Sequence, residues 1–313
     1  MPQNKPTFNR IAVIGMGALG ILYADLLSRA LPTGTVTVIA DEARIRRYQN
    51  SAVTANGNAC TFGFSTPQAY GKADLILFGV KATALDAAIE LARPVTDENT
   101  VLVSLLNGIS SEEIIEENLK TGIMLYCVAQ GMDALRVGTT LTYKNKGVLC
   151  LGLPPETREC PVARNALKRV ESLFDFCKIP YVHEDDIVRR QWCKWMFNIG
   201  INQVVMVHKG TFKDVQKDGP IRDEYIAAMR EVIAVAQKFN VLLTQSDLDE
   251  YVKLASTLNP DGMPSMRQDG LAKRASEVEL FSGTLIRKAE SVGVDVPVNR
   301  ALYAKVKEIE STY

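Results

Sequence analysis

One cation and two amides recur at helical spacing in the second half of the chain. Lys194, Asn198 and Asn202 are each four residues apart, so on a helix they form a single polar stripe. The residues around them, such as Trp195 and Phe197, are strongly apolar. Asparagine is a poor helix former, and solvated helix faces favour Glu, Lys and Arg. We therefore interpret the stripe as one wall of a binding cleft, in preference to an ordinary solvent-facing stripe.

A second polar set follows further along the chain. Ser265, Asp269 and Glu277 also lie at multiples of four residues, within a segment that we expect to be one helix from Ser265 to Val292. The alternative is purely local, with Ser265 as an N-cap and Asp269 as a favourable acid in the first turn. Glu277 would then be one more surface carboxylate. The spacing alone leaves both interpretations open.

A glycine-rich turn near the start of the chain predicts a phosphate cradle. The residues GMGALG fit the GxGxxG pattern, directly after an apolar strand and at the start of a helix. The glycines allow a tight turn and close backbone approach, and the helix N-terminus supplies N–H groups to a pyrophosphate. We expect the cofactor to contact the whole turn, which comprises Gly15, Met16, Gly17, Ala18, Leu19 and Gly20.

The choice between NAD and NADP depends on the end of the second strand. Asp41 lies about 20 residues beyond the glycines, where a carboxylate would accept a hydrogen bond from a ribose 2′-OH and repel a 2′-phosphate. Arg44, Arg46 and Arg47 follow at once and could bind that phosphate instead. The residues leave the two cofactors open.

Two further polar residues follow apolar strands of the same half. Lys81 comes directly after one strand, and Asn107 with Gly108 comes after the next. Dinucleotide sites lie at the carboxyl ends of parallel strands, so both are predicted site residues rather than ordinary strand ends.

The hydrophobic patterns predict an α/β fold followed by an all-α part. Short apolar strands alternate with helical patterns up to about residue 185, which is typical of a mostly parallel Rossmann sheet. Long amphipathic helices follow. We expect a dinucleotide-binding domain over residues 1–185 and a helical substrate and catalytic domain over residues 186–313. Expected strands are 10–14, 35–40, 74–80, 100–105, 122–130 and 141–151, with two short strands around Asn56-Gly57; expected helices are 187–207, 220–240, 246–257, 265–292 and 299–311.

Composition excludes several classes of protein. The 36 basic and 36 acidic residues cancel, so no net charge favours nucleic acid or an anionic membrane. The start, MPQNKPTFNR, has no apolar run typical of a secretory signal, so we expect a soluble cytoplasmic protein. The six cysteines are scattered and the two histidines lack partners at ligand spacing, which predicts mostly buried thiols and no metal site.

Taken together, these motifs make the chain resemble the ketopantoate reductase (2-dehydropantoate 2-reductase) family over nearly its whole length. The glycine turn is common to many families, whereas the Lys/Asn/Asn helix combined with SMxxD and a downstream glutamate is far more specific. The matching residues are the glycine turn, Val80-Lys81-Ala82, Asn107-Gly108, Lys194, Asn198, Asn202, Ser265-Met266, Asp269 and Glu277.

The resemblance implies NADPH-dependent reduction of the 2-keto group of 2-dehydropantoate to (R)-pantoate. It implies that Lys194 is the general acid, and that Glu277 orients the substrate and helps to position Lys194. A cationic donor aimed at the developing alkoxide lowers the barrier to hydride addition. Asn198, Asn202, Ser265 and Asn107 would bind substrate, and Lys81, Asn107, Asp41, Arg44 and Glu277 would contact cofactor.

Two residues depart from the family pattern. Asp41 stands where many members carry an arginine for the 2′-phosphate, so NAD is an alternative to the NADP that the family implies. Phe212 stands where members commonly have another substrate-binding asparagine. A same-fold reductase of a different 2-oxo acid is therefore the first alternative, and a non-enzymatic dinucleotide sensor is the second. A homodimer is left open.

Overall fold

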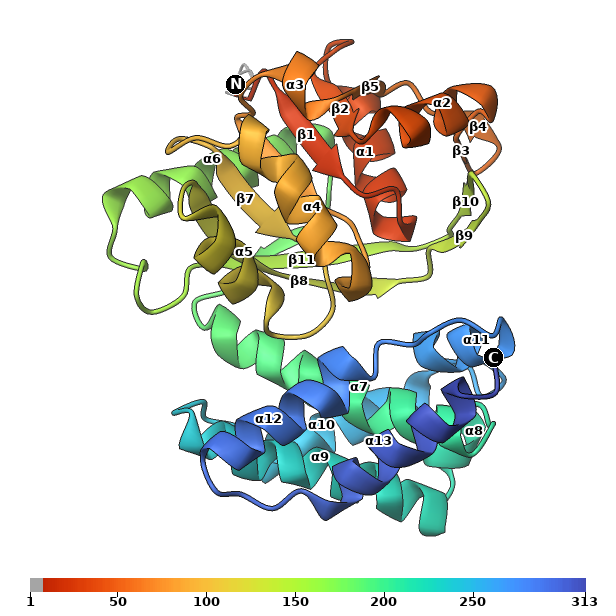
Figure 1. Cartoon of the computed structure of the whole chain (residues 1–313). Helices are drawn as coiled ribbons and strands as arrows, with labels where there is room; N and C mark the ends of the chain where they lie inside the picture. Colours follow the sequence, from red (N-terminus) through yellow and green to blue (C-terminus); the bar gives the residue numbers. More distant parts are fainter. Residues whose placement is uncertain (1–7) are drawn as a thin grey trace. The chain divides into compact units, whose positions relative to one another are not determined.

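The computed structural model describes residues 8–313, which form two compact units. The first unit ends at Ile187 and the second runs from Val188 to Tyr313 (Figure 1). The assignment of cofactor binding to residues 1–185 and of substrate binding to residues 186–313 stays a prediction. Most of the segment MPQNKPTFNR, on which the expectation about a secretory signal depends, lies outside the described residues.

The first unit is built on a Rossmann sheet, as predicted. Its main sheet has eight strands, which are parallel from β5 to β8, while β11 is antiparallel to β8. Four adjacent strands, β7, β6, β1 and β2, are short, largely apolar and buried along their whole length, as expected where helices cover both faces of a sheet. In spatial order the strands are β12 (Tyr181–His183), β11 (Lys146–Gly152), β8 (Ile123–Met132), β7 (Val101–Ser104), β6 (Leu75–Phe78), β1 (Ile11–Ile14), β2 (Val36–Ile39) and β5 (Gly63–Ser65).

Helices form a layer on each face of this sheet. Alternate residues of β1 separate into two buried clusters, with Ile11 and Val13 in one and Ala12 and Ile14 in the other. The first cluster includes helices α1 (Ala18–Ala30) and α6 (Pro161–Cys177), and the second includes α4 (Leu85–Ala92) and α5 (Ser111–Leu119). Two more helices of the unit are α2 (Glu42–Asn50) and α3 (Pro67–Tyr70).

A small second sheet corrects one predicted strand. The hairpin around Asn56-Gly57 is confirmed, with positive φ values of 48° and 79°. Residues 141–151, however, are not one strand, because the Asp133 carboxylate accepts from the Lys144 and Asn145 amides at 2.9 and 2.8 Å and folds them into a turn. This sheet comprises β4 (Asn58–Ala59), β3 (Thr54–Ala55), β10 (Thr140–Thr142) and β9 (Leu135–Val137). The first part of the predicted strand thus belongs to β10 in the small sheet, and the second part belongs to β11 in the main sheet.

The second unit, which the structure describes from residue 188 to residue 313, consists of helices joined by loops and contains no strand. Helix α7 (Ile187–Val207) has the predicted bounds, and α9 packs closely against it at Gly200, where a side-chain carbon would come within 2.8 Å of Met229 and Tyr225. The remaining helices are α8 (Phe212–Gln216), α9 (Pro220–Lys238), α10 (Gln245–Thr257), α11 (Ser265–Leu271), the short π-helix η3 (Glu279–Gly283), α12 (Thr284–Ser291) and α13 (Pro297–Glu310).

The expected helix over residues 265–292 is wrong, because α11 ends early. Lys273 is left-handed, with φ of 49°, and its N–H donates to the Gly270 carbonyl at 3.2 Å. The Arg274 N–H donates to the Asp269 carbonyl at 3.0 Å, which completes a Schellman motif. Glycine usually occupies the left-handed position, so no stop signal is visible in the sequence. Glu277 consequently lies in irregular chain between α11 and η3, not on a continuous stripe with Ser265 and Asp269.

Candidate active site

The carboxyl ends of neighbouring strands in the first unit gather the predicted cofactor residues at one edge of the sheet. Ile14 pairs with Ile39 on one side and Phe78 on the other, and Phe78 pairs with Ser104. The glycine turn, Asp41, Lys81 and Asn107 follow these four strand ends within a few residues. The strand that follows β1, β2, lies on one side of it, and the later strand β6 lies on the other side. Open α/β sheets bind dinucleotides at such a switch point in the strand order.

The glycine turn is packed too tightly for side chains. Gly15 has φ of 101°, and a side-chain carbon on Gly20 would lie 2.0 Å from the Gly15 carbonyl oxygen. Gly79, directly after β6, completes the packing: its added carbon would lie 2.7 Å from Gly20 Cα, and its carbonyl accepts from the Gly17 amide at 3.3 Å. Gly79 was missed in the sequence because it is separated from the motif by about 60 residues.

The start of α1 fits an anionic group. Its N-cap is Gly17, which has no side chain to occupy the first amides, and the first turn of this helix contains no acidic residue. Unsatisfied amides at a helix start carry partial positive charge and bind phosphate. The cradle therefore suits the pyrophosphate of a dinucleotide.

Arg136 of β9 reaches this cradle from the small sheet. Its guanidinium donates to the Met16 carbonyl within the glycine turn and, through Nε at 2.7 Å, to the Gly138 carbonyl. Both acceptors are neutral, so the positive charge stays available beside the turn. Arg136 and Met16 are 120 residues apart, so no local sequence pattern could predict this contact.

Asp41 has a structural task as well as its predicted one. It is the N-cap of α2, and its Oδ1 accepts from the Arg44 amide at 2.7 Å. The Arg44 Nε lies 3.4 Å from the other carboxylate oxygen, with both side chains about half exposed. From the sequence, Asp41 would repel a 2′-phosphate and Arg44 could bind one; in the structure the two side chains form an ion pair.

The loop that carries Asn107 is supported by a buried polar chain. The Ser104 and Ser111 hydroxyls lie 2.8 Å apart, and Ser111 donates to Glu112 Oε2 at 2.7 Å. Ser104 also accepts from the Leu106 amide at 3.3 Å. All three polar side chains of this chain are buried, which fixes the turn from which Asn107 projects. Lys81 is exposed and is the N-cap of the short 3-10 helix η1 (Ala82–Ala84).

In the second unit, α7 presents the predicted polar stripe. Lys194 and Asn198 are half-buried, and Asn202 is only 4% exposed. The stripe is therefore not an ordinary solvated face. The Asn202 amide nitrogen lies 3.5 Å from the Asn198 oxygen, so successive turns of the stripe are in contact.

Asn202 joins the stripe to the start of α11. Its Oδ1 accepts from the Ser265 hydroxyl at 3.1 Å and from the Met266 amide at 3.2 Å. Asn198, Asn202 and Ser265 are thus brought together. The Asn202 oxygen is occupied in capping α11, which leaves Asn198 and Ser265 as the more available groups of the three.

Glu277 reaches the same neighbourhood by another route. The Trp195 indole, next to Lys194, donates to the Leu280 carbonyl at 2.8 Å, and the Leu280 amide donates to the Glu277 carbonyl at 2.9 Å. The segment that contains Glu277 is therefore attached to the turn of α7 that carries Lys194. Asp269 has a different environment: it is 4% exposed, and its carboxylate binds the Arg274 guanidinium at 2.9 Å.

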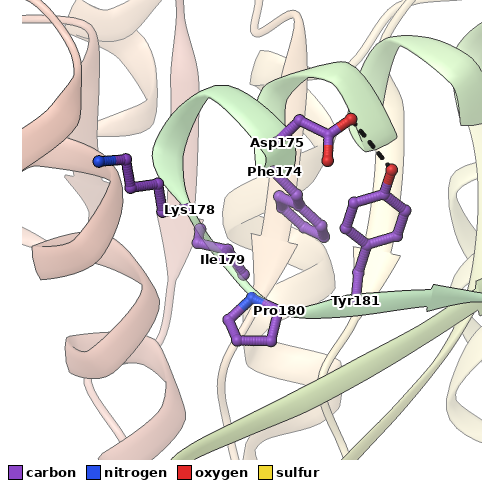
Figure 2. A pocket seen from close by; sticks show the side chains of 6 residues that line it. All are labelled: Phe174, Asp175, Lys178, Ile179, Pro180 and Tyr181. Atoms are coloured by element: carbon purple, nitrogen blue, oxygen red, sulfur yellow. Dashed lines mark hydrogen bonds between the residues drawn. The ribbon is translucent and has the colours of Figure 1, made fainter.

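Three further observations on the described residues concern other kinds of site. Among residues 8–313, no group of three or more His, Cys, Asp or Glu side chains could hold a metal ion. No helix in this range is long and apolar enough to cross a bilayer. A cavity of about 310 Å³ lies where α6 meets β12 (Figure 2), but Asp175 there accepts from the Tyr181 hydroxyl at 3.2 Å, and none of the predicted residues lines it.

A Rossmann sheet with a phosphate cradle and a helical unit with a lysine–amide stripe define the class of nicotinamide-dependent oxidoreductases. Family models agree: that of ketopantoate reductase PanE/ApbA matches residues 11–152, and that of its C-terminal domain matches residues 186–310. The chain belongs to the ketopantoate reductase family. It is therefore an NAD(P)H-dependent enzyme that acts on a small 2-keto acid.

Relatives match nearly the full length of the chain at low identity. The 2-dehydropantoate 2-reductase of Vibrio cholerae is 24% identical, covering 97% of this chain and 98% of its own. That of Pyrococcus horikoshii is 26% identical, covering 96% and 98%.

Solved structures share the fold at similar coverage. A PanE/ApbA family ketopantoate reductase from Ralstonia eutropha (22% identity) and a D-mandelate dehydrogenase with NADH and anilino(oxo)acetate (21%) each have a TM-score of 0.83, with 97% of this chain and 99% of theirs covered. A dimeric ketopantoate reductase from Staphylococcus aureus has a TM-score of 0.76 at 21% identity, with the same coverage.

Proposed function

We propose that the protein is a 2-dehydropantoate 2-reductase, which reduces the 2-keto group of its substrate to give (R)-pantoate. The observation that carries this proposal is the half-buried stripe of Lys194 and Asn198, bonded through Asn202 to Ser265. It provides a cation and several neutral hydrogen-bonding groups on one surface, which suits a polar, anionic keto acid.

In this proposal, the Lys194 ammonium group donates a proton to the keto oxygen of the substrate. When bound, the reduced nicotinamide supplies the hydride. As the keto carbon becomes tetrahedral, negative charge gathers on its oxygen, and a positioned ammonium group both stabilises that charge and delivers the proton. Asn198, Ser265 and Asn107 hydrogen-bond the substrate, and Glu277 orients its hydroxyl groups and the lysine.

Most of the residues proposed to bind the cofactor belong to the first unit. The glycine turn, with Arg136 beside it, holds the pyrophosphate, while Lys81, Asn107 and Glu277 contact the rest of the dinucleotide. The family favours NADPH. The ion pair between Asp41 and Arg44 places both signs of charge at the end of β2, so we propose that NADH is accepted as well.

The second candidate is a reductase of another 2-oxo acid. Phe212 stands where an asparagine is expected, and its backbone amide donates to the Gly262 carbonyl at 3.0 Å, which holds the aromatic residue at the loop before α11. An aromatic residue near a substrate site favours a more apolar keto acid over the dihydroxylated ketopantoate.

Steady-state kinetics over a panel of 2-keto acids, each with NADPH and NADH, tests these proposals. We expect the highest kcat/KM with ketopantoate, and a preference for an aryl keto acid such as benzoylformate would favour the second candidate. No turnover of any 2-keto acid would contradict both. Assembly into a homodimer is also proposed, and size-exclusion chromatography with light scattering measures it directly.

A further inference from the structure

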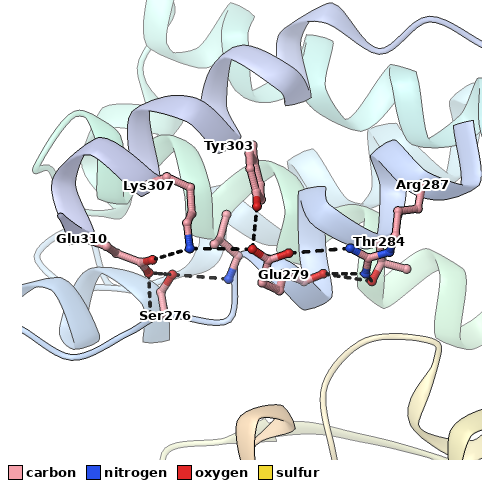
Figure 3. Close-up of polar contacts among 8 residues, drawn as sticks. Ser276, Glu279, Thr284, Arg287, Tyr303, Lys307 and Glu310 are labelled. Carbon is pink, nitrogen blue, oxygen red and sulfur yellow. Dashed lines mark hydrogen bonds and ion pairs between the residues drawn. The ribbon is translucent and has the colours of Figure 1, made fainter. Parts of the chain in front are cut away.

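The segment that carries Glu277 is held by a residue near the end of α13. The Glu310 Oε1 accepts from the Ser276 amide at 2.7 Å and from the Ser276 hydroxyl at 2.6 Å (Figure 3). The same hydroxyl accepts from the Val278 amide at 3.3 Å. Both sequence neighbours of Glu277 are therefore tied to one carboxylate.

Burial makes this attachment firm. The Glu310 side chain is only 11% exposed, and Ser276 and Val278 are buried, whereas Glu277 between them is half-exposed. Hydrogen bonds to a carboxylate that is partly removed from water are stronger than those between neutral groups. The arrangement holds the backbone on both sides of Glu277.

Helix α13 holds the other end of the segment as well. The Tyr303 hydroxyl donates to Glu279 Oε1 at 2.5 Å, at the first residue of the π-helix η3 (Figure 3). Lys307 lies between the two carboxylates, 3.5 Å from Glu310 and 3.7 Å from Glu279. Short π-helices are frequent at functional sites.

These contacts replace the orientation that a regular helix would provide. Residues 272–278 form no helix or strand, and the local backbone bonds of Glu277 itself, from the Leu280 and Phe281 amides to its carbonyl at 2.9 and 3.2 Å, hold it only from the side of η3. An acid that orients a substrate must be held closely, since a displacement of about 1 Å can lower a rate by about 100-fold.

We propose that Glu310 is a positioning residue for Glu277, through which α13 sets the geometry of the active site. This inference rests on the proposed function, because it takes Glu277 to orient the substrate. Glu310 acts only through Ser276 and the backbone and does not touch substrate.

The test is a double-mutant cycle with the 2-keto acid that the wild-type enzyme reduces fastest. We expect Glu310→Ala to lower kcat by about 10-fold, a loss within the range for a small displacement. Glu310→Gln keeps an acceptor oxygen and should stay within about 3-fold of wild type. Glu308→Ala, an exposed residue of the same helix, is the matched control and should leave kcat unchanged.

The double variant decides the mechanism. If Glu310 acts through Glu277, Glu310→Ala causes no further loss in a Glu277→Ala background. Additive losses, or a normal kcat in Glu310→Ala, would overturn the positioning role while leaving the proposed function intact. A normal kcat in Glu277→Ala alone would instead contradict the proposed role of Glu277 and the positioning role with it. Should Glu310→Ala fail to fold, Ser276→Ala removes the hydroxyl that bonds Glu310 and the Val278 amide but keeps the bond from the Ser276 amide, and it should lower kcat by about 3-fold.

Discussion

At the scale of single residues, the Asp41 carboxylate has a structural role beside the recognition role that we propose for it. One oxygen caps α2 by accepting from the Arg44 amide, and the other pairs with the Arg44 side chain. A cofactor with a 2′-phosphate must approach this negative charge, while a ribose 2′-OH can donate to it. The cap and the cofactor preference can be separated, because asparagine caps helices as well as aspartate does.

We predict that Asp41→Asn raises the ratio of kcat/KM for NADPH to that for NADH by about 10-fold. It removes a repulsion of roughly 1.4 kcal/mol, which corresponds to one decade. The melting temperature should not change, since the cap is retained. Asp41→Ala should alter the ratio similarly but also lose about 1 kcal/mol of stability with the cap. An unchanged ratio in Asp41→Asn would remove Asp41 from cofactor discrimination.

At the scale of elements, the site depends on how closely β6 approaches the turn before α1. Gly79 contributes only backbone, yet a side-chain carbon there would lie 2.7 Å from Gly20 Cα and 2.9 Å from its nitrogen. Because these are backbone atoms, neither β6 nor the start of α1 can move aside without a cost in free energy. The cradle must open if Gly79 acquires a side chain.

We predict that Gly79→Ala weakens NADPH and NADH equally, by at least 10-fold in Kd, and destabilises the protein by about 1–3 kcal/mol, as overpacking usually does. Fluorescence titration and thermal unfolding measure the two effects. Gly63→Ala in β5 is the control, because its nearest neighbour would be 3.6 Å away. If Gly79→Ala binds NADPH and NADH with the wild-type Kd, close packing at Gly79 is not required for cofactor binding.

The limits of prediction at this scale follow from the range of the interactions. The local sequence pattern was sufficient to predict β1, the glycine turn and α7, because each pattern is formed by residues that are close in the sequence. The end of α11 was missed because lysine occupies a position that usually requires glycine. Arg136 and Glu310 were missed because their partners, Met16 and Ser276, are 120 and 34 residues away and belong to no motif.

At the scale of the whole molecule, the cysteines form no disulfide; all six lie within the described residues and are free. Burial raises the pKa of Cys60 to about 12 and those of Cys177 and Cys193 to about 11. A raised pKa keeps a thiol protonated at pH 8, so the reactive thiolate is scarce there and increases only as the pH approaches the pKa. Cys160, in contrast, is exposed.

We predict that a thiol reagent such as DTNB at pH 8 modifies one cysteine rapidly in the native protein, and that Cys160→Ser removes this fast phase. Enzymatic activity should survive the modification, because no cysteine belongs to the proposed site. The other thiols should react only on unfolding. Rapid loss of activity at the rate of a second, buried cysteine would contradict this assignment.

The central claim for the whole molecule is that a lysine of the helical unit donates the proton in a nicotinamide-dependent reduction. The most direct test is the kcat of Lys194→Ala with ketopantoate and NADPH, beside the Kd of NADPH measured by fluorescence. We predict a fall in kcat of about 100-fold or more, the scale expected when a general acid is lost, with Kd little changed. Turnover by Lys194→Ala at the wild-type rate would contradict the mechanism.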